Sequence, residues 1–136
     1  MIDIASMIPH REPIKIISEA LELQDDSGIA AAVVNERWPL FDGQAVHSLV
    51  LIEAIAQTAA LVEGYKRKKR GQSAVKGWMV GIKSAEFHRE ILALQTRITV
   101  SIRSLYSFDD YAVINGIVTS GNETLLTAAI QVVRLN

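Results

Sequence analysis

Hydrophobic and polar positions near the start of the chain follow the pattern of two strands joined by a short turn. The segments 14–23 and 28–35 are rich in Ile, Val, Leu and Ala, and residues 24–27 between them are all polar. A polar turn between two apolar runs is typical of a hairpin. We therefore expect an early hairpin, followed over residues 36–43 by a loop in which Pro39 interrupts any regular period.

The middle of the chain has the composition of one long helix, from residue 45 to about residue 69. It lacks proline, consists mostly of helix-forming residues, and ends in basic residues that suit the negative end of the helix dipole. Its first four turns are apolar on nearly all sides, so other elements must cover it on several sides. His47, Glu53 and Gln57 interrupt the apolar stretch, which favours a buried helix over a membrane span.

After residue 73 the pattern changes to the alternation of half-buried antiparallel strands. The alternation is clearest over residues 97–103, where Ile and Val alternate with Arg, Thr and Ser. Further strands are expected at residues 75–87, 111–119 and 125–135, with turns at 109–110 and 120–122. This order predicts an α+β fold, a single domain over residues 1–136 in which an antiparallel sheet wraps around one long central helix.

Charge and cysteine content exclude several classes of function. The chain has 14 Lys and Arg against 15 Asp and Glu, so its net charge of −1 does not attract it to nucleic acid or to an anionic membrane. Without cysteine it has no disulfides, no thiolate nucleophile and no sulfur ligands for zinc. His10 and His88 lack ligand-like spacing and read as structural, and we expect no metal site. The first residues lack the features of a signal peptide, which predicts a cytoplasmic protein.

The hydrophobic content predicts self-association. Hydrophobic residues make up 49% of the chain, which leaves apolar surface beyond what one core of this size holds. Two copies that join the edges of their sheets would bury that surplus and remove the exposed strand edges. We therefore expect a homodimer or a higher homo-oligomer.

Three segments resemble, in order, motifs of the hot-dog-fold 3-hydroxyacyl-(acyl-carrier-protein) dehydratases. Residues 8–14 resemble the family's opening proline-His-Arg segment, and residues 49–57 resemble its central-helix motif, an aliphatic run followed by Glu-Ala-x-Ala-Gln. Residues 81–89 are similar to its Gly-Ile-x-x-x-x-Phe-Arg-Arg strand, and Glu-x-x-Ala-Gln-Thr at 53–58 resembles the divergent aryl polyene branch. The resemblance implies a hot-dog fold, an acyl thioester substrate on acyl carrier protein or coenzyme A, and no cofactor beyond the phosphopantetheine that carries it.

The chain also departs from the family's pattern. The dehydratases carry their catalytic His in a Gly-His-Phe-Pro loop fourteen residues before the Glu, where this chain has Pro39. Where the family's helix opens with Pro-Gly, this chain has His47-Ser48, and where the family's first strand has Asp, it has Ser18. The later Pro-Gly-Asp turn of the family is replaced by Ala-Leu-Gln at residues 93–95. Three functions therefore remain open: a dehydratase, an acyl thioesterase, and a catalytically silent acyl-binding partner of another dehydratase.

Glu53 is the main candidate for chemistry because it stands in an otherwise apolar helix. An ionised carboxylate there is costly unless paired, so its side chain should face a cleft or a polar partner. Dehydration needs a base that takes the C2 proton and an acid that protonates the departing C3 hydroxyl, and Glu53 with His47 would supply both. His47 precedes Glu53 by six residues, about 240° around one helix, so the two meet only if His47 lies in the preceding loop or across a two-fold axis.

These residues also have structural interpretations. Glu53 could form an ion pair across a dimer, and His47 could cap the helix or pack against a loop. Gln57 lies one turn after Glu53 and could bind Glu53, a substrate group or a water that replaces the missing His, or merely support the helix. The backbone N–H groups of Ser48 and Leu49 at the helix start are candidates to hold the thioester carbonyl where enolate charge develops.

A run of five basic residues at the end of the helix is the sharpest charge feature of the chain. It comprises Lys66, Arg67, Lys68, Lys69 and Arg70. The run could complement the helix dipole and aid solubility, or it could dock an acidic acyl carrier protein or a phosphate of its pantetheine arm. Nucleic acid is a poorer partner because no stacking aromatic residues accompany the run.

Overall fold

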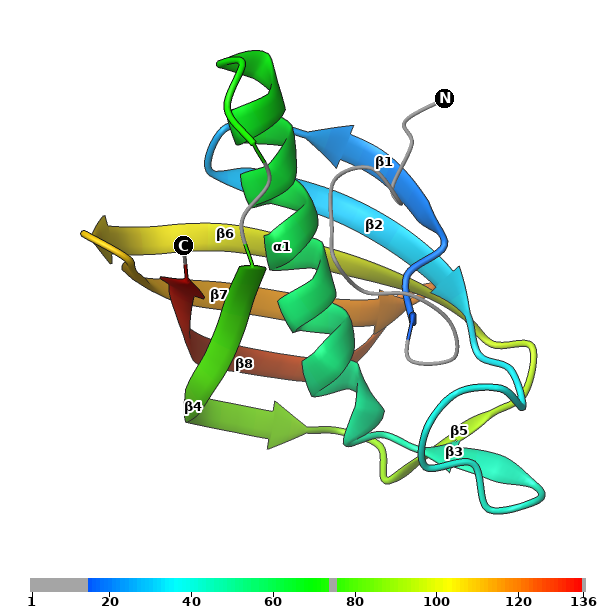
Figure 1. Cartoon of the computed structure of the whole chain (residues 1–136). Coiled ribbons are helices and arrows are strands. Elements are labelled where there is room, and N and C mark those ends of the chain that lie inside the picture. Colours follow the sequence, from blue (N-terminus) through cyan, green and yellow to red (C-terminus); the bar gives the residue numbers. More distant parts are fainter. Residues whose placement is uncertain (1–14, 74–75, 136) are drawn as a thin grey trace.

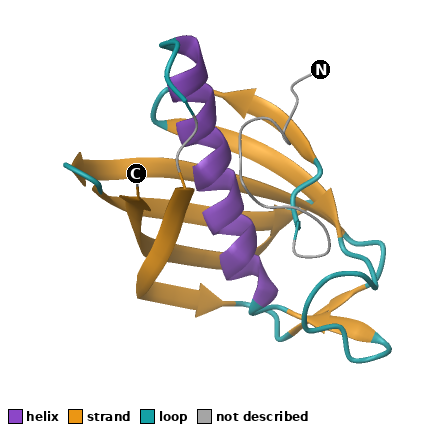
Figure 2. Cartoon of the chain, viewed as in Figure 1, coloured by secondary structure: helices purple, strands orange, loops and turns teal. Residues whose placement is uncertain are grey.

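The computed structural model of the chain describes residues 15–73 and 76–135. These residues form one helix and eight strands: β1 (Glu19–Leu23), β2 (Ser27–Val33), β3 (Ala45–His47), α1 (Val50–Lys69), β4 (Lys76–Phe87), β5 (Ile91–Ala93), β6 (Arg97–Phe108), β7 (Tyr111–Ser120) and β8 (Glu123–Leu135). Six strands form one antiparallel sheet in the order β1-β2-β6-β7-β8-β4, and α1 lies across one face of it (Figures 1 and 2). The predicted α+β fold with one long helix against an antiparallel sheet is confirmed.

The core forms where the apolar side of the sheet meets α1. Ile98, Val100 and Ile102 alternate with more exposed residues along β6 and are buried beneath the helix, as their period of two requires. On β7, the backbone at Gly116 comes so close to α1 that a Cβ there would lie 2.7 Å from side-chain carbons of Ile55. A residue with no side chain therefore lets the helix lie close against the middle of the sheet.

The predicted start of the helix at residue 45 is wrong, because residues 45–47 form strand β3 and α1 begins at Val50. β3 pairs with β5 in a small second sheet, and Val46 between them is fully buried. Asp42 Oδ1 accepts hydrogen bonds from the amides of Gln44 and Ala45 (2.8 and 2.9 Å), and this turn directs the chain into β3. Helix propensity over these residues is overridden by a strand partner that is more than forty positions away along the chain.

The first strand also begins later than expected, at Glu19 instead of residue 14. Residues 15–18 run beside the sheet, and the Ile16 and Ile17 side chains are buried. Their amides donate to the side chain of Gln57 on α1 and not to a neighbouring strand. An apolar run alone therefore predicted burial correctly but not strand pairing.

The two edges of the six-stranded sheet differ. β1 is short, has a register shift and exposes Glu19 and Glu22, which are features that discourage pairing with another chain. β4 is 12 residues long, and register shifts at 79–81 and 82–84 bend it sharply, as Figure 1 shows. Its exposed side chains include Val80 and Ile82. In the described part of the chain, no helix has the apolar length needed to cross a membrane.

Candidate active site

A cavity of about 400 Å³ lies between α1 and the strands β4, β6, β7 and β8 of the sheet. Its walls are formed by α1, the turn after β1, and parts of β4, β6, β7 and β8; on α1 the lining residues are Glu53, Ala56, Ala59, Ala60, Val62, Glu63 and Lys66. The sheet side contributes apolar residues such as Ile102, Ala112, Ile114 and Val132. This size is within the range of small-molecule sites, and the aliphatic part of the wall suits a hydrocarbon chain.

Glu53 lies in the first turn of α1, half-buried, on the wall of this cavity. Gln57 is one turn further along, and its Nε2 donates to Oε1 of Glu53 at 3.2 Å. The side chain of Gln57 is fully buried, and its Oε1 accepts from the amides of Ile16 (2.7 Å) and Ile17 (3.2 Å). These bonds fix the Gln57 amide, which in turn holds the Glu53 carboxylate at the cavity.

His47 lies at the end of β3 and not on the helix that carries Glu53. Its exposed side chain is on β3, and its Nδ1 accepts a hydrogen bond from the Leu49 amide at 3.1 Å. Nδ1 must therefore be unprotonated in this arrangement, and the proton of the neutral ring is on Nε2. Among the residues that the structure describes, His47 makes no hydrogen bond or ion pair with Glu53. The ring of His47 thus bonds to the residue that precedes α1, and the helix start has no side-chain cap from the described residues.

The amides at the start of α1 are mostly engaged by the protein itself. The His47 amide donates to Leu40 O (3.1 Å), the Ser48 amide to Glu90 O (2.8 Å), and the Leu49 amide to the His47 ring. Ser48 is buried, whereas half of the Leu49 surface is exposed. The amide of Val50 makes no hydrogen bond among residues 15–73 and 76–135, and the residue itself is buried, at 3% exposed.

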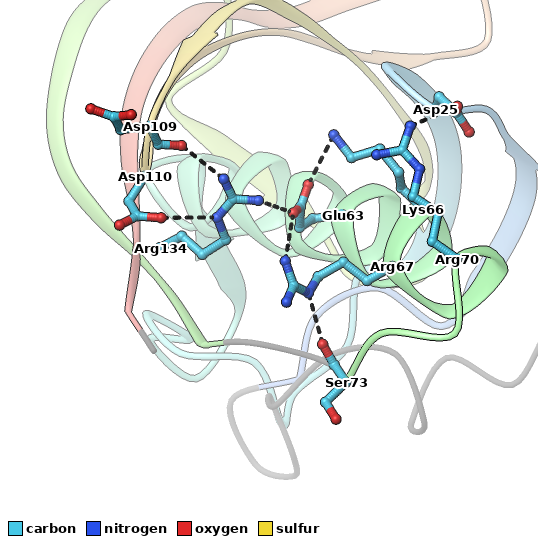
Figure 3. A network of polar contacts seen from close by, with 9 residues as sticks. All are labelled: Asp25, Glu63, Lys66, Arg67, Arg70, Ser73, Asp109, Asp110 and Arg134. Atoms are coloured by element: carbon cyan, nitrogen blue, oxygen red, sulfur yellow. Dashed lines mark hydrogen bonds and ion pairs between the residues drawn. The ribbon is translucent and has the colours of Figure 1, made fainter.

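The basic run at the end of α1 is largely paired with two carboxylates (Figure 3). Lys66 and Arg67 lie 3.4 and 3.9 Å from Glu63, while Lys69 and Arg70 lie 3.0 and 3.7 Å from Asp25. The hydrogen bond and charge of Lys69 lower the pKa of the Asp25 carboxyl, and Asp25 in turn raises the pKa of Lys69. The exposed basic surface is thus smaller than the sequence suggests, because its charges are shared with the fold.

His88 does not line the cavity. His10 lies outside the described residues, and His88 is exposed at the end of β4 with its Nε2 3.8 Å from Glu86. In the described ranges, no three histidines or carboxylates gather where they could hold a metal ion.

Sequence reasoning missed several residues that line the cavity. Arg134, Asp110 and Tyr111 line it together with Glu63, although all three lie more than 40 positions after the end of the helix. In the sequence, each of the three has the features of an ordinary residue at a strand end or in a turn. Only the pairing of β7 with β8, and of both against α1, brings them to one place.

Comparisons with known proteins agree with this architecture. The sequence profile of the ApeP-like family, described as ApeP dehydratase, matches residues 2–136. The 3-hydroxyacyl-[acyl-carrier-protein] dehydratase FabZ of Burkholderia cenocepacia is 29% identical over 91% of this chain and 87% of its own length. The dehydratase heterocomplex ApeI:P of Xenorhabdus doucetiae superposes with a TM-score of 0.91 at 15% identity over 100% of this chain and 93% of that chain. A hypothetical thioesterase with coenzyme A from Streptococcus pneumoniae superposes with a TM-score of 0.66 at 14% identity, over 87% of this chain and 85% of that chain. Both solved structures share the hot-dog fold expected from the sequence.

Proposed function

Because the chain belongs to the ApeP-like dehydratase family, we propose that it is a subunit of a dehydratase that removes water from a 3-hydroxyacyl thioester. Its FabZ relatives are named as 3-hydroxyacyl-[acyl-carrier-protein] dehydratases, so the proposed substrate is carried on the phosphopantetheine of an acyl carrier protein. The pathway is fatty-acid or polyene-type biosynthesis. The reaction requires acid-base groups only, so the proposal includes no cofactor and no metal.

The position of Glu53 carries this proposal. The carboxyl group of Glu53, held by Gln57 on the cavity wall, acts in its protonated form: it gives its proton to the departing C3 hydroxyl while a base takes the C2 proton, which yields the trans-2-enoyl thioester, water and the Glu53 carboxylate. The acyl chain extends into the cavity beside α1. The amide of Val50 at the helix start is the proposed donor to the thioester carbonyl, where enolate charge develops.

A second subunit supplies the base in this proposal. His47 is exposed and makes no hydrogen bond or ion pair with Glu53 in the described part of its own chain, so in this proposal the two form the catalytic pair across an interface. The long apolar edge of β4 is the proposed contact, and the partner is a second copy of this chain or a related dehydratase, since one structural relative is titled a dehydratase heterocomplex. The basic run at residues 66–70 docks the acidic carrier protein.

Turnover of Glu53 variants tests the proposed chemistry. We expect Glu53→Gln to lower kcat for 3-hydroxyacyl carrier thioesters by about 10²-fold or more, because amide and carboxyl are similar in size but the amide cannot transfer the proton. Glu19→Gln, an exposed carboxylate on β1, is the matched control and should retain full activity. Mass spectrometry of the acyl product is the measurement. A rate unchanged in Glu53→Gln would remove Glu53 from the site, and release of free acid would identify a thioesterase.

A catalytically silent partner subunit is the second candidate, and one observation favours it. The loop position at which the family's dehydratases carry their His is Pro39, next to Trp38, which is only 4% exposed. If this chain only stabilises an active dehydratase, the purified chain alone has no turnover, and the mixed complex keeps its activity when Glu53 is replaced. The Glu53→Gln assay on the complex therefore separates the two candidates.

A further inference from the structure

The lining of the cavity combines aliphatic residues with a group of charged residues near the C-terminal half of α1. Between Glu53 and Glu63, the wall of α1 presents Ala56, Ala59 and Ala60, and the facing strands present aliphatic side chains. The charged group comprises Asp25, Asp26, Glu63, Lys66, Asp110 and Arg134. The ten residues from Glu53 to Glu63 span about 15 Å of helix, so the apolar part has a defined length.

Arg134 holds this charged group together (Figure 3). From β8, its Nη1 donates to Oε1 of Glu63 on α1, and its Nη2 donates to the backbone oxygen of Asp109 at 2.8 Å. Its Nε lies 3.5 Å from Oδ1 of Asp110. The side chains of Arg134 and Glu63 are each 29% exposed. One side chain thus joins the helix to the β6–β7 turn at the wall of the cavity.

We propose that the Arg134–Glu63 ion pair is the end of the acyl site and sets the longest acyl chain that the protein accepts. The inference rests on the proposed function for the identity of the ligand. A chain that fits between Glu53 and Glu63 buries all of its carbons against apolar walls. A longer chain must press its methyl end against a partly buried ion pair, or separate the pair and leave two charges without their partners.

Binding of unreactive ligands of increasing length tests this assignment independently of turnover. We choose S-alkyl pantetheine thioethers, measured by titration calorimetry with the assembled protein, because they carry no cleavable thioester. For wild type, each added methylene should tighten binding about four-fold until the chain fills the apolar part of the cavity. The chain length at which affinity stops rising is called the break. In Arg134→Ala this break should move to longer chains by about two to four methylenes, the length of the side chain removed.

A variant with the opposite effect does not disturb the ion pair. Ala112 lines the sheet side of the cavity, and Ala112→Leu should move the break to shorter chains. Arg89→Ala, which removes an exposed ion pair with Glu123 elsewhere on the sheet, is the control and should keep the wild-type profile. Thermal melting establishes that each variant is folded, and Ala112→Leu retains the test if Arg134→Ala does not fold.

The outcomes distinguish the end-of-site assignment from the proposed function on which it rests. A break that moves up in folded Arg134→Ala, with Arg89→Ala unchanged, supports the end-of-site assignment, and an unchanged break in folded Arg134→Ala contradicts it; if Arg134→Ala does not fold, a break that moves down in Ala112→Leu is the supporting result. An identical break in the wild type and in both cavity variants overturns the assignment and leaves the proposed function standing. If no alkyl pantetheine binds at any length, both the assignment and the proposed acyl ligand fall.

Discussion

At the scale of single residues, Gln57 connects folding to the candidate chemistry. The same side chain accepts hydrogen bonds from two amides of the segment before β1 and donates one to Glu53. Sequence reasoning left its role open between a group of the site and a support for the helix. The contacts give it both tasks, because a buried amide side chain has an acceptor oxygen at one corner and a donor nitrogen at the other.

Replacement of Gln57 by Leu should therefore affect stability and catalysis together. The amides of Ile16 and Ile17 would lose their acceptor while buried, and we expect a loss of about 1–3 kcal/mol in the free energy of unfolding. Turnover should fall through kcat more than through KM, because the orientation of Glu53 changes and the cavity does not. Urea unfolding and steady-state kinetics are the two measurements.

Thr58→Val is the matched control for Gln57→Leu. Thr58 is equally buried on α1, but its hydroxyl donates to the Ala54 carbonyl within the same helix, so its loss leaves no distant group without a partner. We expect a smaller change in stability and no change in kcat. Equal effects of the two substitutions would show that Gln57 acts only as one more buried polar residue.

At the scale of elements, the end of α1 is held to the β1–β2 turn by charge. Asp25 faces Lys69 and Arg70, and the lowered pKa of its carboxyl means that the folded state favours the ionised form. The stabilisation is present above the ordinary pKa of Asp and is lost as the pH falls through the lowered pKa. The pair is exposed, so its effect on stability is small. Its larger effect is on the surface charge offered to a carrier protein.

Carrier binding should respond in opposite directions to changes on the two sides of this pair. Asp25→Asn removes a negative charge beside Lys69 and Arg70, and we expect tighter binding of an acidic acyl carrier protein. The double variant Lys69→Ala with Arg70→Ala should weaken binding, and both effects should shrink as salt rises. Surface plasmon resonance at two ionic strengths is the measurement. Affinity that is the same in all three proteins would remove the basic run from the docking surface.

At the scale of the whole molecule, the two edges of the sheet predict how subunits meet. β4 is long and exposes 57% of Val80 and 48% of Ile82, whereas β1 is short and flanked by glutamates. We expect the double variant Val80→Glu with Ile82→Glu to shift the assembly towards monomer, because facing carboxylates repel across an edge-to-edge contact. Light scattering after size exclusion measures the mass.

Leu21→Glu on β1 controls for the added charge. Leu21 is 48% exposed, as Ile82 is, but lies on the opposite edge of the sheet, and its replacement should leave the mass unchanged. If Leu21→Glu dissociates the assembly and the β4 variant does not, the interface is on the β1 side.

The sequence by itself determined the types of the main elements and the chemistry available. Period-two alternation on β6, the long run of helix formers and the polar turns are local signals, and they predicted the sheet around one helix. A carboxylate within an apolar helix marked Glu53 in the same way. The inferences about the elements succeeded because propensity and periodicity depend on neighbours within a few residues.

Only the tertiary structure decided what depends on distant partners. β3 is a strand because β5 lies beside it, Ile16 and Ile17 find an acceptor on α1, and His47 bonds to the Leu49 amide. The same holds for the charged part of the cavity, where Arg134 meets Glu63 across 71 positions of sequence. Burial and hydrogen bonding between remote segments set these positions, and no local pattern carries that information.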